Sequence, residues 1–274
     1  MKKIAIITDS KKDIFNLGDY LRIVSILPNF KTKEIYWFSD KYLHSIIKKS
    51  EHIKKIYSLN KFHYSKFSKK KDIILNLLKN NQLRFNEYSV AKLINYKQDI
   101  KISGVDLCKK ICDKFKIKNY KVYSNRSKKN HLDKYDIFIN YLVPRKWKVK
   151  EYPKKNLKFI EKKIKEKFKK IRICWQNNND SLDEYIKKIN SSKIILTIVG
   201  LGLHLGMLFN KEIIVLCGPT FFNDLKKYKK KEIIYPKKKV KWNKKGKMSD
   251  IQKEKILNFL TKKINKKIYL NRNI

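Results

Sequence analysis

The fold is decided by one apolar segment, Lys193–Cys217, which reads KIILTIVGLGLHLGMLFNKEIIVLC. Its first part, up to Val199, is a run of apolar and β-branched residues, which is typical of a strand buried on both faces of a sheet. A glycine-rich turn then opens an apolar helical stretch, Gly200–Phe209, and a second strand pattern follows at Glu212–Cys217. A strand, a helix and a strand in this order predict a parallel β-α-β unit with glycines where the first strand meets the helix.

The same alternation of strand and helix patterns extends along the chain in both directions. Strands are predicted at Lys3–Thr8, Glu34–Phe38, Ile53–Ser58, Tyr135–Val143 and Ile171–Trp175. Helices are predicted at residues 18–27, Lys41–Lys49 and Pro153–Phe168, and after two capping boxes, Ser181–Glu184 and Ser249–Gln252.

The middle of the chain lacks this alternation. Lys69–Phe115 is predicted to be largely helical, with one helical piece at Ile73–Leu78. The composition turns polar at Asn125–Asp133, and the alternation begins again after it. We therefore expect an α/β protein with two Rossmann-like domains, residues 1–128 and 129–274, whose parallel sheets face each other across a cleft.

The chain carries a formal net charge of +45, and 42% of its 274 residues are apolar. This apolar share is far too high for a disordered chain, so a buried core is expected. Only six of the 69 basic residues are arginine, the side chain that best reads phosphates and base edges. A composition bias toward lysine is therefore the favoured explanation of the charge. Attraction to an anionic membrane comes second, and specific binding of nucleic acid is not expected.

Cysteine spacing and hydropathy indicate a cytoplasmic protein. The four cysteines form no Cys-x-x-Cys pair, so reduced core thiols are expected. The most hydrophobic window, Ile195–Phe209, is too short to span a bilayer. We expect a cytoplasmic location, with peripheral contact at the inner face of the cytoplasmic membrane.

Two segments are placed where open α/β sheets bind ligands, at the turn from a strand into a helix. The first contains Gly18 and Asp19. The Asp19 carboxylate is a candidate base or ligand contact, although an aspartate in a first helical turn also complements the helix dipole. The second is Gly200–Gly206, whose glycines allow a phosphate to approach the backbone. On so apolar a helix, His204 is either a ligand contact or a satisfied core residue.

The second segment also fits a loose Gly-x-Gly-x-x-x-Gly pattern, so a dinucleotide-dependent oxidoreductase is an alternative. Such a site needs an acidic residue at the end of the next strand to hold a ribose hydroxyl, and Leu216–Pro219 offers none. A non-catalytic polyanion-binding protein is a further alternative, based on the net charge.

Three stretches resemble glycosyltransferase family 9, the bacterial heptosyltransferases. The run His204–Thr220, HLGMLFNKEIIVLCGPT, resembles the family signature His-Leu-Ala-Ala-Ala-Leu-Gly-Lys-Pro-x-Val-x-Leu-x-Gly-Pro-Thr without a gap. Leu17–Asp19 with the downstream Pro28 resembles the N-terminal Leu-Gly-Asp segment, and Lys150–Pro153 resembles the Lys-x-Trp-Pro element. The three stretches occur in the family's order and span both halves of the chain.

The resemblance implies a GT-B fold and an inverting, metal-independent glycosyltransferase. Such an enzyme moves a heptose-like sugar from a nucleotide-diphosphate donor to a lipopolysaccharide or lipid-linked glycan acceptor, with no cofactor besides the nucleotide sugar. The resemblance further implies that Asp19 is the catalytic base and that Gly18 lies on the acceptor side. The residues that would bind the donor are Lys150, Gly200, Gly202, Leu203, His204, Gly218, Pro219 and Thr220.

The residues agree with a reaction that uses no metal ion. A diphosphate leaving group gathers negative charge, which either a metal ion or fixed cations and backbone dipoles must stabilise. The chain contains no Asp-x-Asp pair, so fixed cations and dipoles are expected. The family's Asp-Ser/Thr-Gly element is absent from Ile198–Gly202, so the donor sugar and the acceptor are left open.

Overall fold

The computed structural model describes residues 2–9, 17–30, 33–48, 50–62, 67, 72–77, 92–95, 104–118, 133–218, 228–237 and 248–269. The chain divides into two compact units, Met1–Asn125 and Arg126–Ile274, close to the boundary expected after residue 128. Each unit has its own five-stranded sheet, and the described strands pair in parallel throughout. The prediction of two parallel-sheet α/β units is confirmed.

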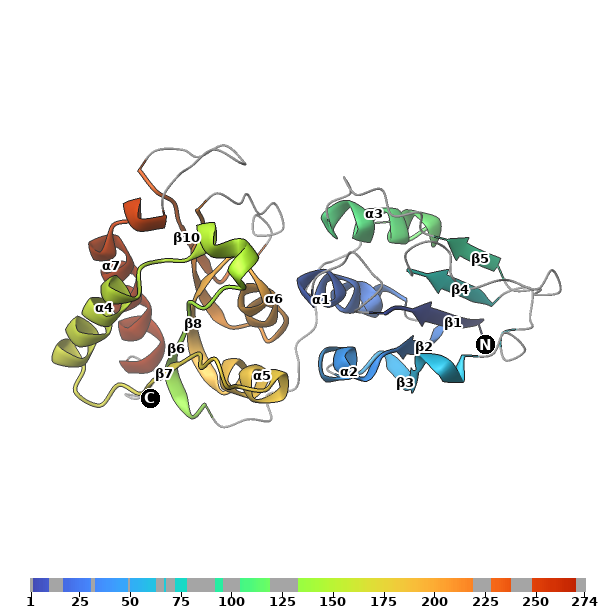
Figure 1. The fold of residues 1–274 in the computed structure, drawn as a ribbon, viewed down its shortest axis with the longest axis horizontal. Helices are drawn as coiled ribbons and strands as arrows, with labels where there is room; N and C mark the ends of the chain where they lie inside the picture. Colours follow the sequence, from blue (N-terminus) through green and yellow to red (C-terminus); the bar gives the residue numbers. More distant parts are fainter. Residues whose placement is uncertain are drawn as a thin grey trace. The chain divides into compact units, whose positions relative to one another are not determined.

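The first unit is built on a sheet with strand β1 at its centre (Figure 1). The strand order is β3-β2-β1-β4-β5, with bounds Lys2–Ile7 (β1), Lys33–Ser39 (β2), Ile53–Ser58 (β3), Ile73–Asn76 (β4) and Lys92–Asn95 (β5). The described α-helices are α1 (Leu17–Ile26), α2 (Lys41–Ile47) and α3 (Gly104–Lys114). The chain leaves β1 toward β2 on one side, while β4 and β5 lie on the other. This reversal places α1, which follows β1, at a switch point of the sheet.

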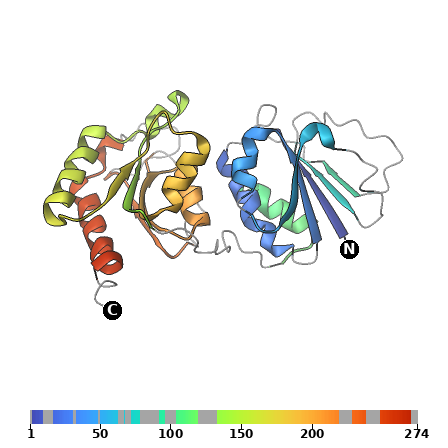
Figure 2. The same cartoon turned by 90° about the horizontal axis from the view of Figure 1, so that it is seen from below.

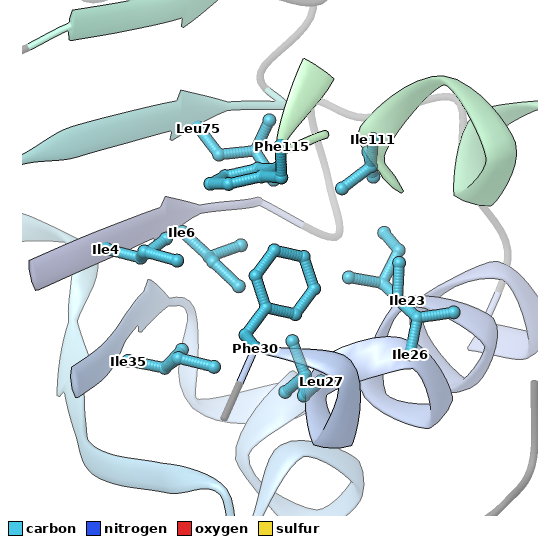
Figure 3. Close-up of a pocket in the computed structure, with 10 residues that line it drawn as sticks. All are labelled: Ile4, Ile6, Ile23, Ile26, Leu27, Phe30, Ile35, Leu75, Ile111 and Phe115. Atoms are coloured by element: carbon cyan, nitrogen blue, oxygen red, sulfur yellow. The ribbon is translucent and has the colours of Figure 1, made fainter. Parts of the chain in front are cut away.

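Residues of this sheet alternate between two cores. Ile4 and Ile6 lie on the face covered by α1 and α3, where the side chains enclose a small apolar cavity (Figure 3). Its lining is Ile4, Ile6, Ile23, Ile26, Leu27, Phe30, Ile35, Leu75, Ile111 and Phe115. Ala5 and Ile7 belong to the opposite face, which packs against aromatic side chains. There the Phe38 ring stacks on the ring of Tyr57, with 5.1 Å between their centroids.

One predicted helix of this unit is wrong, because the piece around Ile73 and Ile74 is strand β4. β4 pairs with β1 on one side and with β5 on the other. Its residues Ile73, Ile74 and Leu75 are all buried, as in a strand covered on both faces, so no alternation of polar and apolar residues marks it. A short apolar run of this kind fits a buried helix equally well. The stretch also contains β5, whereas its last part, α3, is helical as predicted.

The second unit is a sheet between two layers of helices (Figures 1 and 2). Its order is β10-β9-β8-β6-β7, with bounds Tyr135–Asn140 (β6), Ile173–Trp175 (β7), Ser192–Ile198 (β8), Glu212–Leu216 (β9) and Lys231–Ile234 (β10). The α-helices are α4 (Lys154–Lys167), α5 (Leu182–Asn190), α6 (Leu201–Leu208) and α7 (Lys253–Ile264). Helices α4 and α7 pack together over one face and share its core, and α5 and α6 pack together on the other.

One of the two predicted capping boxes is present. Ser181 Oγ accepts a hydrogen bond from the Glu184 amide at 3.2 Å, and the Glu184 carboxylate accepts one from the Ser181 amide at 2.8 Å. The second box is wrong. Ser249 lies in a 3-10 turn, Met248–Asp250, and its hydroxyl bonds the neighbouring Asp250 at 3.4 Å. Gln252 is the cap residue of α7 and makes no side-chain cap bond.

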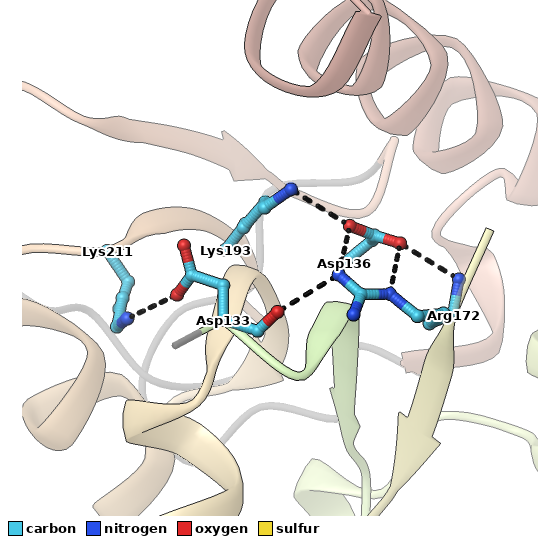
Figure 4. A network of polar contacts seen from close by, with 5 residues as sticks. All are labelled: Asp133, Asp136, Arg172, Lys193 and Lys211. Atoms are coloured by element: carbon cyan, nitrogen blue, oxygen red, sulfur yellow. Dashed lines mark hydrogen bonds and ion pairs between the residues drawn. The ribbon is translucent and has the colours of Figure 1, made fainter. Parts of the chain in front are cut away.

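A charged network holds the amino-terminal edge of the second sheet (Figure 4). The fully buried Asp136 accepts hydrogen bonds from Arg172 Nε at 3.2 Å and from the Arg172 amide at 3.0 Å, and Lys193 Nζ lies 3.1 Å from its carboxylate. Burial raises the pKa of Asp136, but the bonds from Arg172 and Lys193 outweigh burial and hold the pKa below its usual value. The network joins the starts of β6, β7 and β8.

Candidate functional site

The strand order of the second sheet reverses between the neighbouring strands β6 and β8. Helix α4 leads from β6 to β7 on one side, and α6 leads from β8 to β9 on the other. Ligands of open α/β sheets bind outside the carboxyl ends of the strands at such a reversal. The candidate site is therefore sought around the carboxyl ends of β6 and β8.

A buried polar network lies at these strand ends. Asn140 on β6 and Thr197 on β8 are 5% and 1% exposed. Thr197 Oγ1 donates to Asn140 Oδ1 at 2.6 Å, and Asn140 Nδ2 donates to Gln176 Oε1 just after β7. Gln176 Oε1 also accepts from the Leu142 amide at 2.9 Å. Because these side chains satisfy one another, the three strand ends form a rigid, uncharged floor.

Helix α6 begins beside this floor. The amides of Leu203 and His204 donate back to the Gly200 carbonyl at 3.1 and 3.4 Å, which starts the helical hydrogen-bonding pattern. The amides before them belong to the first turn, which has no intrahelical partner for its N–H groups. A helix start of this kind attracts anions, because these N–H groups and the helix dipole point the same way.

The two glycines at this helix start have different reasons to be glycine. A Cβ at Gly200 would have no neighbour within 4 Å, so the space beside the Gly200 backbone is open. A Cβ at Gly202 would lie 2.2 Å from Asn140 Oδ1 and 2.7 Å from Tyr185 Oη. Gly200 therefore fits the predicted close approach of a phosphate, whereas Gly202 is required by packing against the polar floor.

Leu203 and His204 are both buried, with 0% and 4% of their surface exposed. The Leu203 side chain belongs to the core, so its contribution to an anion site is limited to its backbone. The burial of His204 agrees with the alternative of a core histidine, and its predicted contact with the donor stays a prediction.

Lys150 approaches the same edge of the sheet from another segment. It ends the 3-10 helix Arg145–Lys150, and its ammonium lies 4.4 Å from the centroid of the Trp147 ring. Burial lowers the pKa of Lys150, an effect that Cys217 opposes. Burial also raises the pKa of Cys217 to about 12, and Lys150 opposes that shift. The two groups are therefore within electrostatic range of each other, and Cys217 directly follows β9.

The end of β9 adjoins the start of α6. Leu216, which precedes Cys217, pairs with Ile198 on β8, and neighbouring strands lie about 4.8 Å apart. Within the described part of the chain, no carboxylate forms an ion pair with Lys150. A half-buried ammonium without a carboxylate partner is a candidate partner for an anionic ligand.

The remaining predicted donor residues follow β9. A Cβ at Gly218 would lie 2.1 Å from Met248 Sδ, so a larger residue here would have to displace the flexible end of the Met248 side chain. Pro219 and Thr220 lie outside the described residues.

Gly18 and Asp19 belong to the first unit, in the first turn of α1. Asp19 is 8% exposed, and its carboxylate forms an ion pair with Arg22 one turn later on the same helix. The position next to the switch point after β1 suits a base or a ligand contact. The pair with Arg22 gives this carboxylate a structural role as well, since it links two turns of α1.

Sequence reasoning missed the polar floor and Tyr185. Asn140 stands at the end of the strand YDIFIN, and Thr197 interrupts the apolar run IILTI near the end of β8. A polar side chain near the carboxyl end of an otherwise apolar strand is a usable signal, because burying it requires a partner. The identity of that partner depends on the strand order.

No described helix is long and apolar enough to cross a bilayer. No three His, Cys, Asp or Glu side chains in the described ranges gather closely enough to hold a metal ion.

Comparison with known proteins shows the fold. No protein-family model and no curated protein matches the chain. A glycosyl transferase family 9 structure from Veillonella parvula matches with a TM-score of 0.63 at 12% identity, over 96% of this chain and 97% of that chain. E. coli heptosyltransferase WaaC with ADP matches with a TM-score of 0.59 at 13% identity, over 96% and 98% of the two chains.

A third match, the E. coli ADP-heptose lps heptosyltransferase II, has a TM-score of 0.52 at 14% identity, again over 96% and 98% of the two chains. The predicted GT-B-like fold class is therefore confirmed. The chain has the fold of glycosyltransferase family 9, as its three sequence stretches predict.

Proposed function

We propose that this protein is an inverting, metal-independent glycosyltransferase that moves a heptose-like sugar from a nucleotide-diphosphate donor to a lipopolysaccharide or glycan acceptor. Near-full-length similarity to glycosyltransferase structures supports the enzyme class. E. coli WaaC has been solved with ADP and with ADP-2-deoxy-2-fluoro heptose, which supports a nucleotide sugar as the donor here.

One observation carries the proposal, namely the half-buried Lys150 ammonium at the edge of the sheet that also holds the start of α6. Lys150 is within electrostatic range of Cys217, which follows β9, and burial lowers the pKa of Lys150. A bound diphosphate would supply the negative charge that offsets this desolvation. The N–H groups at the start of α6 would bind further phosphate oxygens, and the open space at Gly200 admits them.

The proposed reaction is a single displacement. The acceptor hydroxyl oxygen forms a bond to the anomeric carbon while the bond from that carbon to the donor diphosphate breaks, which inverts the configuration. Asp19 takes the acceptor proton as general base. Lys150 and the α6 amides stabilise the charge that develops on the leaving nucleoside diphosphate, so no metal ion and no cofactor are needed.

The test is nucleotide binding by isothermal titration calorimetry with ADP, UDP, GDP and NAD+. We expect a nucleoside diphosphate to bind and Lys150→Ala to weaken its affinity at least tenfold, as for a lost hydrogen bond to a charged group. Lys148→Ala is the matched control, because Lys148 is an exposed lysine of the same 3-10 helix. Equal affinities in the Lys150→Ala and Lys148→Ala proteins would reject the role of Lys150. Binding of NAD+ alone would favour an oxidoreductase.

A peripheral contact with the inner face of the cytoplasmic membrane is part of the proposal, because the acceptor is lipid-linked. Helix α4 exposes lysines along its solvent side, at 154, 155, 158, 162, 163, 165 and 167. Each lysine near an anionic surface contributes about 1 kcal/mol of attraction at ordinary ionic strength. Flotation with phosphatidylglycerol vesicles should carry the protein at low salt and release it at high salt. If neutral phosphatidylcholine vesicles carry as much protein as the phosphatidylglycerol vesicles do, the contact is not electrostatic.

A further inference from the structure

The hydroxyl of Tyr185, beside the switch point, has no hydrogen-bond partner within the described structure. Tyr185 lies near the start of α5 and is 7% exposed. Its ring meets the Phe138 ring edge-on, with 5.8 Å between their centroids. No hydrogen bond from its hydroxyl to a described residue exists. A protonated hydroxyl that bonds no described protein group is available to donate a hydrogen bond to a ligand.

The hydroxyl lies against the first turn of α6. Tyr185 Oη is 2.7 Å from the position that a Cβ of Gly202 would occupy, and Gly202 is the second residue of that helix. Asn140 Oδ1 lies near the same point, but it already accepts from Thr197 Oγ1 at 2.6 Å. The absence of a side chain at Gly202 thus leaves room for the Tyr185 hydroxyl against the first turn of α6.

The chemistry around this hydroxyl favours an anion. Burial raises the pKa of Tyr185, so the hydroxyl stays protonated and is a hydrogen-bond donor at physiological pH. The loop Ile198–Gly202 offers no hydroxyl or charged side chain of its own. The partners for an anion at this helix start are therefore backbone N–H groups, the Lys150 ammonium at the neighbouring strand end, and the Tyr185 hydroxyl.

We propose that the Tyr185 hydroxyl donates a hydrogen bond to a diphosphate oxygen of the donor bound at the start of α6. The inference rests on the proposed function, since it names an additional donor-binding residue of the same site. It differs from the sequence-based assignment, in which every contact at this helix start comes from the segment Gly200–His204 itself.

The experiment compares Tyr185→Phe with Tyr228→Phe. Tyr228 is also a phenol whose pKa is raised by burial, but its hydroxyl donates to the Lys211 carbonyl at 2.5 Å, before β9 at the opposite edge of the sheet. Binding of ADP, inorganic pyrophosphate and adenosine is measured by calorimetry for wild type and both variants, and the melting temperature of each protein is measured without ligand.

We expect Tyr185→Phe to weaken binding of ADP and of pyrophosphate by about tenfold, as for a lost bond to a charged acceptor, and to leave adenosine binding and the melting temperature unchanged. Tyr228→Phe should show the reverse, with a lower melting temperature and unchanged affinity. Unchanged affinity of Tyr185→Phe for ADP and pyrophosphate would overturn the inference while the proposed function stands. Failure of the wild-type protein to bind any nucleoside diphosphate or pyrophosphate would overturn both.

Discussion

Replacing Gly202 with alanine tests whether this glycine is there for packing. The new Cβ would lie 2.2 Å from Asn140 Oδ1 and 2.9 Å from Asn140 Cγ, so the Asn140 amide must move. Moving the Asn140 amide breaks its hydrogen bonds to the side chains of Thr197 and Gln176, where water cannot replace them easily because Asn140 is buried. Each buried polar group left without its partner costs about 1–3 kcal/mol, and alanine in a helix returns about 1 kcal/mol relative to glycine. The net destabilisation is roughly 2–4 kcal/mol.

The assay is thermal or urea unfolding of the whole chain, followed through the transition of the second unit. For a domain of this size the expected loss corresponds to a melting temperature lower by roughly 5–15 °C. Gly200→Ala is the matched control on the same turn, because its Cβ meets nothing within 4 Å and its φ of 179° is extended backbone that alanine adopts. We expect it to cost no more than about 1 kcal/mol of cap stability. If the Gly202→Ala protein is as stable as the Gly200→Ala protein, the packing argument is refuted.

Two further predictions concern Asp136 and Asp19. Asp136→Asn should lower the free energy of unfolding by about 1–3 kcal/mol in chemical denaturation at pH 7, because the partly exposed Arg172 and Lys193 lose the carboxylate that they bond. The pKa of Asp136 lies below its unfolded value, so the stabilisation by this carboxylate is complete above about pH 4 and is lost as the pH falls through the folded pKa. The free energy of unfolding of the Asp136→Asn protein should therefore fall less steeply with acid than that of the wild type. Parallel curves of the two proteins below about pH 4 would contradict this. Asp19→Asn should abolish sugar transfer in a coupled nucleoside-diphosphate release assay and leave nucleotide affinity within a factor of two, whereas retained turnover would remove Asp19 as the base.

Most of the second unit was predictable because its sequence signals are local. The capping box at Ser181 begins α5, and the apolar runs around Gly200–Phe209 give β8, α6 and β9 in the expected order. These signals act between residues a few positions apart, where backbone geometry alone decides which groups meet. They also lead to the prediction of an anion site at the start of α6, since a helix that follows a strand through a glycine turn presents its N–H groups there.

Strand β4 of the first unit shows what short-range sequence patterns do not determine. The run around Ile73 is a central strand and not a helix, because coverage on both faces removes the alternation that distinguishes the two. Gly202 shows a related limit of sequence reasoning, and its predicted contact with the donor stays a prediction. A glycine pattern does not say whether a ligand or a neighbouring side chain takes the space, and here Asn140 and Tyr185 take it.

The amino-acid order of this protein determined its elements, their alternation and the division into two α/β units, because apolar periodicity and helix caps involve residues close together in the chain. The tertiary structure alone decided which distant residues meet. Asn140 and Thr197 are 57 residues apart, yet they share a hydrogen bond because β6 and β8 are neighbours in the sheet. Strand order follows from how the helices of the whole unit cover the two faces, so the polar floor and the positions of the Tyr185 hydroxyl and of Lys150 appear only once the sheet is assembled.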